Sequence, residues 1–118
     1  MSYVDGYVLA VPEKNLKAYA RMAKMGKEMW MKHGALDYKE CVGDDLETKW
    51  GKPFSKMMKV KPGETVVFSW VVFKSRAHRD RVNAKVMKEM EEKTGDMKDM
   101  PMDPKRMVYG GFKAIVEV

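Results

Sequence analysis

The sequence predicts a single α+β domain, because two strand–helix–strand patterns follow one another along its 118 residues. The clearest pattern begins at residues 65–73, a run of β-branched, aromatic and small residues that is apolar at both parities and predicts a central strand. After a two-residue turn, Ser75 is a favourable N-cap, and Val82, Val86 and Met90 recur every four residues as on one side of a helix. A buried strand that leads into a helix packed on its own sheet therefore organises the fold.

The remaining elements follow from the same apolar spacing. Residues 3–11 alternate larger and smaller side chains, which is typical of a strand, and Pro12 ends it. A helix is predicted from about residue 14 to residue 33, because the following residue is Gly34 and glycine commonly ends a helix. Further strands are predicted at residues 36–42 and 107–118, and a glycine pair, residues 110–111, interrupts the last one.

The resulting order, βαββαβ, predicts the ferredoxin-like arrangement in one domain that covers residues 1–118. Two βαβ units with right-handed crossovers give a four-stranded antiparallel sheet with both helices on one face. The opposite face has no cover within the chain, and the central strand offers it apolar side chains at either parity. Such a face predicts a homodimer in which two sheets meet, which is a dimeric α+β barrel.

Composition limits the classes of protein that the chain can represent. Apolar residues make up 45% and charged residues 34%, as in soluble folded domains, and the formal charge is +6. No apolar run approaches the roughly 20 residues that span a bilayer, and the N-terminus lacks a signal-peptide pattern. Cys41 is the only cysteine, so we expect no internal disulfide and a cytoplasmic location. Two histidines and one cysteine give no metal-site spacing, and we expect neither metal nor cofactor.

Polar side chains of the predicted strands share one parity, and we assign them to the sheet face away from the helices. Hydrogen-bonding and titratable groups there suit a pocket between two sheets. The candidates are Asp5, Tyr7, Tyr38, Glu40, Ser69, Tyr109 and Lys113. Glu40 or Asp5 could serve as a base and Tyr109 as a hydrogen-bond donor. Alternatively, these groups satisfy one another at a dimer seam.

The start of the second helix carries a cluster of cations. Arg76, His78 and Arg79 lie in its first two turns, where the helix dipole disfavours positive charge. Arginines beside free backbone N–H groups form a candidate anion-binding site. The alternative is that the arginines pair with Glu40 or with the Asp44–Asp45 pair.

The first helix carries a basic side, as nucleic-acid-binding surfaces do. Its cations are Lys17, Arg21, Lys24 and Lys32. Base stacking also needs exposed aromatic side chains, and the aromatic residues Tyr19 and Trp30 belong to the apolar stripe of this helix. Nucleic acid is therefore a disfavoured partner.

The connection of residues 43–64 is longer than an ordinary hairpin loop. It contains Trp50, Phe54 and Met57, whose apolar side chains predict that it packs on the body of the protein or on a partner.

Four stretches of the sequence resemble one known family. They are residues 4–8 (VDGYV), 33–41 (HGALDYKEC), 65–87 and 106–113 (RMVYGGFK). They are similar to the YbaA-like family of uncharacterised bacterial proteins, and the similarity runs nearly end to end, with residues 47–60 matching loosely. The resemblance implies a dimeric α+β barrel and supplies no activity and no catalytic residues. The wider superfamily of such barrels includes cofactor-independent monooxygenases and haem-handling enzymes, which is a similarity of fold alone.

Three functional hypotheses follow from these observations. The favoured one is the binding of a small molecule, anionic if the arginine cluster takes part, in a pocket formed by the dimeric barrel. The second is a cofactor-independent enzyme of the monooxygenase kind, and the third is an RNA- or protein-interaction module that uses the basic side of the first helix. Salt dependence separates the first from the third, because binding through several lysines falls steeply with ionic strength.

Overall fold

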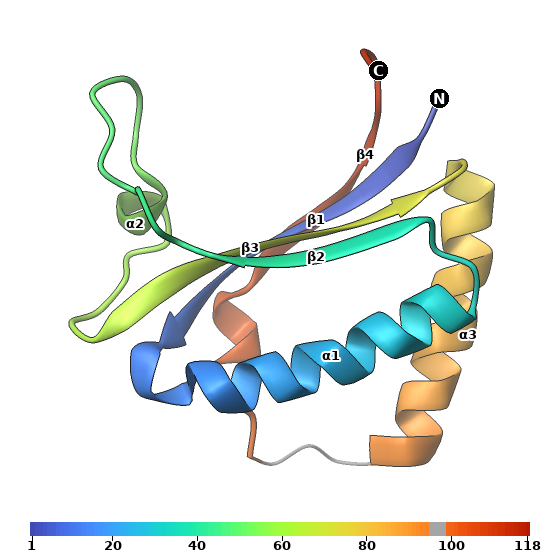
Figure 1. Cartoon of the computed structure of the whole chain (residues 1–118), viewed down its shortest axis with the longest axis horizontal. Helices are drawn as coiled ribbons and strands as arrows, with labels where there is room; N and C mark the ends of the chain where they lie inside the picture. Colours follow the sequence, from blue (N-terminus) through green and yellow to red (C-terminus); the bar gives the residue numbers. More distant parts are fainter. Residues whose placement is uncertain (95–98) are drawn as a thin grey trace.

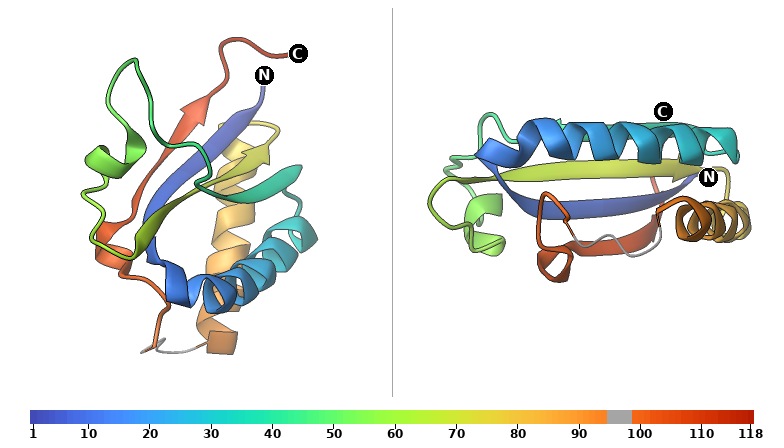
Figure 2. Two further views of the ribbon diagram at one scale, coloured as in Figure 1. Left: turned by 60° about the vertical axis from the view of Figure 1, so that its left-hand side comes forward. Right: turned by 90° about the horizontal axis from the view of Figure 1, so that it is seen from below.

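The computed structural model of the chain describes residues 1–94 and 99–118. Its strands and helices are β1 (Tyr3–Pro12), η1 (Glu13–Asn15), α1 (Leu16–Lys32), β2 (Asp37–Val42), α2 (Phe54–Met57), β3 (Glu64–Phe73), α3 (Arg76–Thr94), η2 (Pro104–Arg106) and β4 (Val108–Lys113). The strands form one antiparallel sheet in the order β2-β3-β1-β4. Both long helices lie on one side of this sheet (Figures 1 and 2). The predicted ferredoxin-like arrangement is therefore confirmed.

Alternation along the two central strands decides which side chains the helices cover. On β3, Val67, Val71 and Phe73 are at most 2% exposed, whereas Phe68 on the opposite parity is 41% exposed. On β1, Leu9 and Val11 are buried on the same face as Val67. The helix-covered face therefore consists of the odd-numbered residues of β1 and β3.

Two clusters of apolar side chains form the core under the helices. One contains Trp30 from α1, Phe73 from β3, and Val82 and Val86 from α3. The other contains Leu9, Val11 and Val67 of the sheet with Tyr19 and Ala23 of α1. Of the predicted stripe of α3, Val82 and Val86 are buried, at 2% and 0% exposure, and Met90 is partly buried against the first cluster.

The ends of the helices follow from local sequence. The backbone N–H of His78 donates to the Ser75 hydroxyl oxygen at 3.1 Å, which is the N-cap contact predicted for α3. Gly34 follows the C-terminus of α1 with φ of +115°, a conformation that costs glycine little. These two short-range signals fix where the chain leaves one layer and enters the other.

The last strand differs from its prediction. β4 ends at Lys113 rather than at residue 118, and the glycine pair does not interrupt it, because Gly110 pairs with Gly6 and Gly111 with Asp5 in a continuous register. A Cβ on Gly111 would overlap the guanidinium of Arg79 and the ring of Tyr3. This glycine therefore permits a close approach rather than a break in the strand.

The long connection is only partly packed within the chain. α2 lies within it, and Met58, directly after α2, is 6% exposed. Phe54 makes an edge contact with Phe68, with ring centroids 5.8 Å apart. Trp50 is 87% and Met57 is 44% exposed, so the prediction that these two pack on the body is wrong, and packing on a partner stays a prediction.

The segment before β4 is bound to the first residue of β3, Glu64. Arg106, the last residue of η2, donates through Nη1 and Nη2 to the two carboxylate oxygens of Glu64, at 2.6 and 2.9 Å. The two prolines of residues 96–106 predict a loose segment, of which residues 96–98 lie outside the described residues. No helix in the described part of the chain has the length and apolar character to cross a bilayer.

Candidate functional site: the uncovered sheet face

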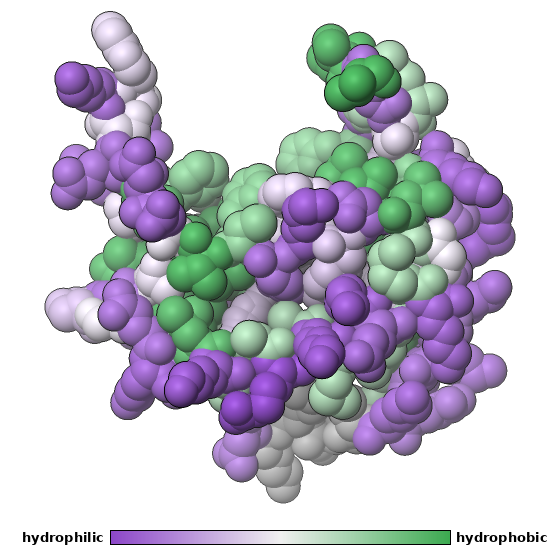
Figure 3. Space-filling model, viewed as in Figure 1, coloured by the Kyte–Doolittle hydropathy of each residue, from purple (hydrophilic) through white to green (hydrophobic). Residues whose placement is uncertain are grey.

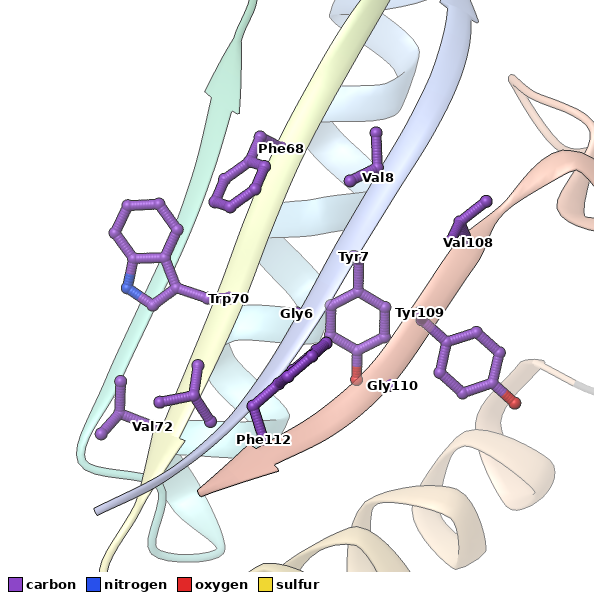
Figure 4. Close-up of a pocket in the computed structure, with 11 residues that line it drawn as sticks. Gly6, Tyr7, Val8, Phe68, Trp70, Val72, Val108, Tyr109, Gly110 and Phe112 are labelled. Atoms are coloured by element: carbon purple, nitrogen blue, oxygen red, sulfur yellow. The ribbon is translucent and has the colours of Figure 1, made fainter. Parts of the chain in front are cut away.

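The sheet face away from the helices is apolar and hollow. Even-numbered residues of β1, β3 and β4 surround a pocket of about 550 Å³ on this face (Figure 4). The apolar side chains that line it are Val4, Val8, Phe68, Trp70, Val72, Val108 and Phe112. Tyr7 and Tyr109 also border the pocket, but strand alternation directs their rings to the other face.

Two glycines form the floor of this hollow. Gly6 of β1 and Gly110 of β4 are directly paired across the strands, so no side chain rises from the sheet at that point. The ring of Phe112 lies beside the gap, because a Cβ on Gly6 would be 3.7 Å and one on Gly110 3.9 Å from its Cε1. The hollow therefore depends on two glycines that are far apart in the sequence and become neighbours only when the sheet forms.

Aromatic side chains form one wall of the pocket. Phe68 and Trp70 make an edge contact with ring centroids 5.6 Å apart, and Phe54 continues the row on the other side of Phe68. The ammonium of Lys39 lies 6.0 Å from the centre of the Trp70 ring, where the negative face of the ring attracts a cation. The wall is thus aromatic, with the Lys39 ammonium at its rim.

A second, smaller hollow lies at the β2 edge of the same face. It has a volume of about 260 Å³ and lies where the 43–64 connection leaves the sheet. Its lining residues are Cys41, Val42, Gly43, Leu46, Phe54, Val66 and Phe68. We call it the β2 notch. Cys41 is exposed there and carries a free thiol.

The seven predicted pocket residues lie together on the other face. The register pairs Tyr7 with Ser69 and Tyr109, and Glu40 with Ser69, and these residues share the parity of the buried Val67 and Val71. The assignment of Asp5, Tyr7, Tyr38, Glu40, Ser69, Tyr109 and Lys113 to the face away from the helices is therefore wrong. The physical reason is that β3 is apolar at both parities, so its sequence did not determine which face the helices cover.

Asp5 is 3% exposed and is held by two side chains of α3. Nε of Arg79 donates to both of its carboxylate oxygens, at 3.0 and 3.1 Å, and the Asn83 amide donates to Oδ2 at 3.1 Å. The Asn83 amide oxygen in turn accepts from Nε1 of Trp30 at 2.9 Å. This closed network ties β1, α1 and α3 together and leaves Asp5 unsuited to act as a free base.

Glu40 accepts hydrogen bonds from two tyrosines. Tyr19 of α1 donates at 2.7 Å and Tyr38 of β2 donates at 2.5 Å. Burial, followed by these contacts with Glu40, raises the pKa of both Tyr19 and Tyr38 above the usual range of tyrosine. The Tyr38 hydroxyl also lies 3.4 Å from where a Cβ on Gly26 would be, so α1 is in close contact with β2 at this mid-helix glycine.

Of the other predicted pocket residues, Ser69 pairs with Glu40 across the strands, and Tyr7 lies close enough to Glu40 to interact with it electrostatically. The rings of Tyr7 and Tyr109 stack at 5.8 Å with an interplanar angle of 16°, and burial raises the pKa of Tyr7 above its usual range. Ser69 is 4% exposed, under the helices. Lys113 is exposed at the end of β4.

The candidate anion-binding residues have partners within the chain. Arg79 binds Asp5 and, through Nη1, Asp80 at 2.8 Å, and these contacts, that with Asp80 first, raise the pKa of Arg79 above its usual value. Arg76 lies 3.9 Å from Asp80, and Nδ1 of His78 accepts from the backbone N–H of Lys74 at 3.0 Å. Pairing with acidic residues was the predicted alternative, but the partners are Asp5 and Asp80 instead of Glu40, Asp44 or Asp45.

Sequence reasoning missed the residues that hold the buried network and those that hollow the open face. Arg79 was predicted to bind an anion or to pair with Glu40, Asp44 or Asp45, and Asn83 was not a candidate, because their contacts with Asp5 join positions that are far apart in the chain. Gly26 did carry a usable signal, since glycine inside a helix costs about 1 kcal/mol relative to alanine and needs a packing reason. Within residues 1–94 and 99–118, no group of three His, Cys, Asp or Glu side chains is placed to hold a metal ion.

Comparison with known proteins decides the family. Residues 2–104 match the family model described as protein of unknown function DUF1428. The chain belongs to this family. The uncharacterised protein YbaA of Escherichia coli K12 is 38% identical over 117 residues, which is 99% of each chain, and the YbaA of Shigella flexneri matches equally well. The expected relationship with YbaA-like proteins is therefore confirmed.

The fold of this DUF1428 member has a solved counterpart. A dimeric ferredoxin-like protein from an uncultured marine organism aligns with a TM-score of 0.56 and 12% identity, covering 100% of both chains. At this level of identity the likeness concerns the fold alone, and it agrees with the sheet order described above.

Proposed function

We propose that this DUF1428 protein is a homodimer in which two uncovered sheet faces meet and enclose an apolar site for a small uncharged molecule. The observation that carries the proposal is the 550 Å³ hollow in an apolar sheet face that the helices leave uncovered. Pockets of about 300–1,000 Å³ that are lined mainly by apolar and aromatic groups are typical of small-molecule sites.

The exposed surface of the chain supports association. Its accessible area is 8555 Å², against about 6,600 Å² expected for a compact monomer of 13.6 kDa. Its radius of gyration is 15.0 Å, against about 13.5 Å expected for this length. The excess of roughly 2,000 Å² exceeds the roughly 800 Å² that each partner buries in a standard interface. The solved ferredoxin-like counterpart is described as dimeric, which supports the same assembly here.

The character of the pocket favours an uncharged ligand and binding without chemistry. Among the described residues that line it, none carries a carboxylate, an amine or a guanidinium. The arginine that was a candidate for an anion, Arg79, is engaged by Asp5 and Asp80. The lack of a side chain at Gly6 and Gly110 leaves space where a simple dimer seam would be filled.

The dimer is tested with two neighbouring residues that face opposite ways. Val108 is 55% and Tyr109 is 68% exposed, and only Val108 belongs to the uncovered face. Sedimentation equilibrium at micromolar concentration should give about twice 13.6 kDa for the wild type and for Tyr109→Asp, but about 13.6 kDa for Val108→Asp. A wild type that stays monomeric over this range would refute the proposal.

The ligand site is tested with the uncharged dye Nile red. Gly110→Val adds a β-branched side chain inside the hollow, where a Cβ has 3.9 Å to its nearest neighbour. Lys113→Val adds the same side chain to the same strand on the other face and serves as the control. Dye fluorescence should rise when the wild type or Lys113→Val is added. Gly110→Val should need at least about tenfold more protein for the same rise, which corresponds to a loss of about 1.4 kcal/mol of binding free energy. Equal dye binding by all three proteins would exclude this pocket as the site.

A further inference from the structure

Among the described residues, two apolar features at the borders of the open sheet face lack cover within the chain. One is the β2 notch, defined above, at the base of the 43–64 connection. The other is the segment of residues 114–118 that follows β4, in which Ile115 is 80%, Val116 is 86% and Val118 is 132% exposed. Figures 1 and 3 show the connection and the C-terminal segment as two projections on the open side of the sheet.

The C-terminal segment is positioned by hydrogen bonds in spite of its exposure. The backbone N–H of Ala114 donates to the carbonyl oxygen of Ser2 at 2.9 Å, and the backbone N–H of Ser2 donates to the Glu117 carboxylate at 2.7 Å. These contacts with Ser2 lower the pKa of Glu117. The segment is thus held along β1 while its apolar side chains point to solvent.

The two features lie at diagonally opposite corners of the sheet. The β2 notch contains Cys41 and Val66, so it lies on the β2 edge at the start of β3. The C-terminal segment leaves β4, the opposite edge strand, beside Tyr3, which pairs with Phe73 at the end of β3. Within one chain the two cannot meet.

We propose that residues 115–118 of each protomer occupy the β2 notch of the other. The proposal rests on the homodimer proposed above. Two sheets that face each other are related by a two-fold axis in the plane between them. When this axis is perpendicular to the line from the notch to the C-terminal segment, rotation about it places the C-terminal segment of one protomer over the notch of its partner. The strands of the two sheets then cross at nearly a right angle, as in orthogonal sheet packing. In this arrangement each apolar segment covers an apolar notch, twice per dimer.

The only cysteine of the chain reports on this contact, because Cys41 lines the notch and is exposed. In the full-length variant Val116→Cys, mild oxidation should give a covalent dimer in which the thiol introduced at position 116 is bonded to Cys41 of the partner subunit, as found by peptide mapping. A disulfide needs the two Cα atoms within about 7 Å, so it does not form between remote sites.

Three controls make the result specific. The wild type should give no covalent dimer, because the two Cys41 thiols lie at opposite corners of the assembly. Val116→Cys combined with Cys41→Ser should give no linkage to the notch. Tyr109→Cys, which places an exposed thiol on the other face, should not react with Cys41.

The possible outcomes separate this inference from the dimer itself. A linkage between Cys41 and position 116 supports the exchange of C-terminal segments. A dimer by sedimentation that gives instead a Cys41–Cys41 linkage, a linkage between two introduced thiols, or none overturns the inference and leaves the dimer standing. As an independent readout, Val116→Ser combined with Ile115→Ser should raise the dimer dissociation constant at least about tenfold, and an unchanged constant also overturns it.

Discussion

The two faces of the sheet differ in the kind of side chain that they carry and in what contacts those side chains. On the helix-covered face, Asp5 and Glu40 are partly or fully buried, and both receive hydrogen bonds from α1 or α3. On the uncovered face, the side chains around the hollow are apolar and are not covered by the helices, although Phe54 contacts Phe68 at one side. Polar groups thus lie where the chain itself supplies partners, and apolar groups lie where a second molecule must cover them.

This contrast separates stability from association. Side chains on the helix-covered face should act on the free energy of unfolding of one chain, since their contacts are intramolecular. Side chains on the uncovered face should act on binding, since their burial awaits a partner or ligand. The following changes test the intramolecular side of this division, from the largest expected effect to the smallest.

Asp5→Ala should lower the free energy of unfolding by about 3–5 kcal/mol, because it leaves the largely buried guanidinium of Arg79 without its inner partner. Asp80, the outer partner of the same arginine, has a side chain that is 54% exposed. Asp80→Ala should therefore lower the free energy of unfolding by less than about 1 kcal/mol. Urea unfolding of both variants measures the difference. Equal losses would show that the Asp5 network is no stronger than a surface pair.

Gly111→Ala should cost about 2 kcal/mol, because its Cβ would overlap Arg79 and Tyr3 under the sheet. Gly6→Ala places the same methyl group on the uncovered face, 3.7 Å from Phe112, and should change the free energy of unfolding by less than about 0.5 kcal/mol. Urea midpoints at one protein concentration compare the two glycines. A costly Gly6→Ala with a harmless Gly111→Ala would reverse the assignment of the faces.

Tyr38→Phe should cost about 1.5 kcal/mol, because it removes one of two donors to the Glu40 carboxylate. Tyr19→Phe removes the other donor and should cost a similar amount. The double variant should show non-additive loss, since both hydroxyls act on one carboxylate. Strict additivity in urea unfolding would show that the two tyrosines act independently of Glu40.

Lowering the pH should remove the stabilisation that the ion pair between Arg106 and Glu64 contributes at the start of β3. The hydrogen bond from Arg106 lowers the pKa of Glu64 from 4.5 to about 2 in the folded chain. Because the folded pKa lies below the unfolded value, this stabilisation is complete above about pH 4.5 and is lost as pH falls toward 2. Urea unfolding at pH 7, 4.5 and 3 should therefore show a shallower fall for Glu64→Gln than for the wild type. Parallel curves would mean that Glu64 does not contribute to acid unfolding.

The candidate site could be predicted only in part from the sequence. The parity of Asp5, Tyr7 and Ser69 follows from alternation, so their common face could be deduced. The polar partners could not, because Arg79 and Asn83 reach Asp5 across 74 and 78 residues of chain. The pairing of Gly6 with Gly110 likewise depends on the register between β1 and β4. The sequence of one strand with small and large residues on both parities does not determine that register.

The sequence by itself determined the order of strands and helices, the turn at Ser75, the end of α1 at Gly34 and the buried stripe of α3, because each depends on contacts within a few residues. Only the tertiary structure decided which face of the sheet the helices cover. β3 is apolar on both faces, so local spacing gives the two parities equal weight. The choice depends on where Tyr19, Trp30 and Val82 of the helices find complementary side chains on the sheet, and that is a property of the packed core.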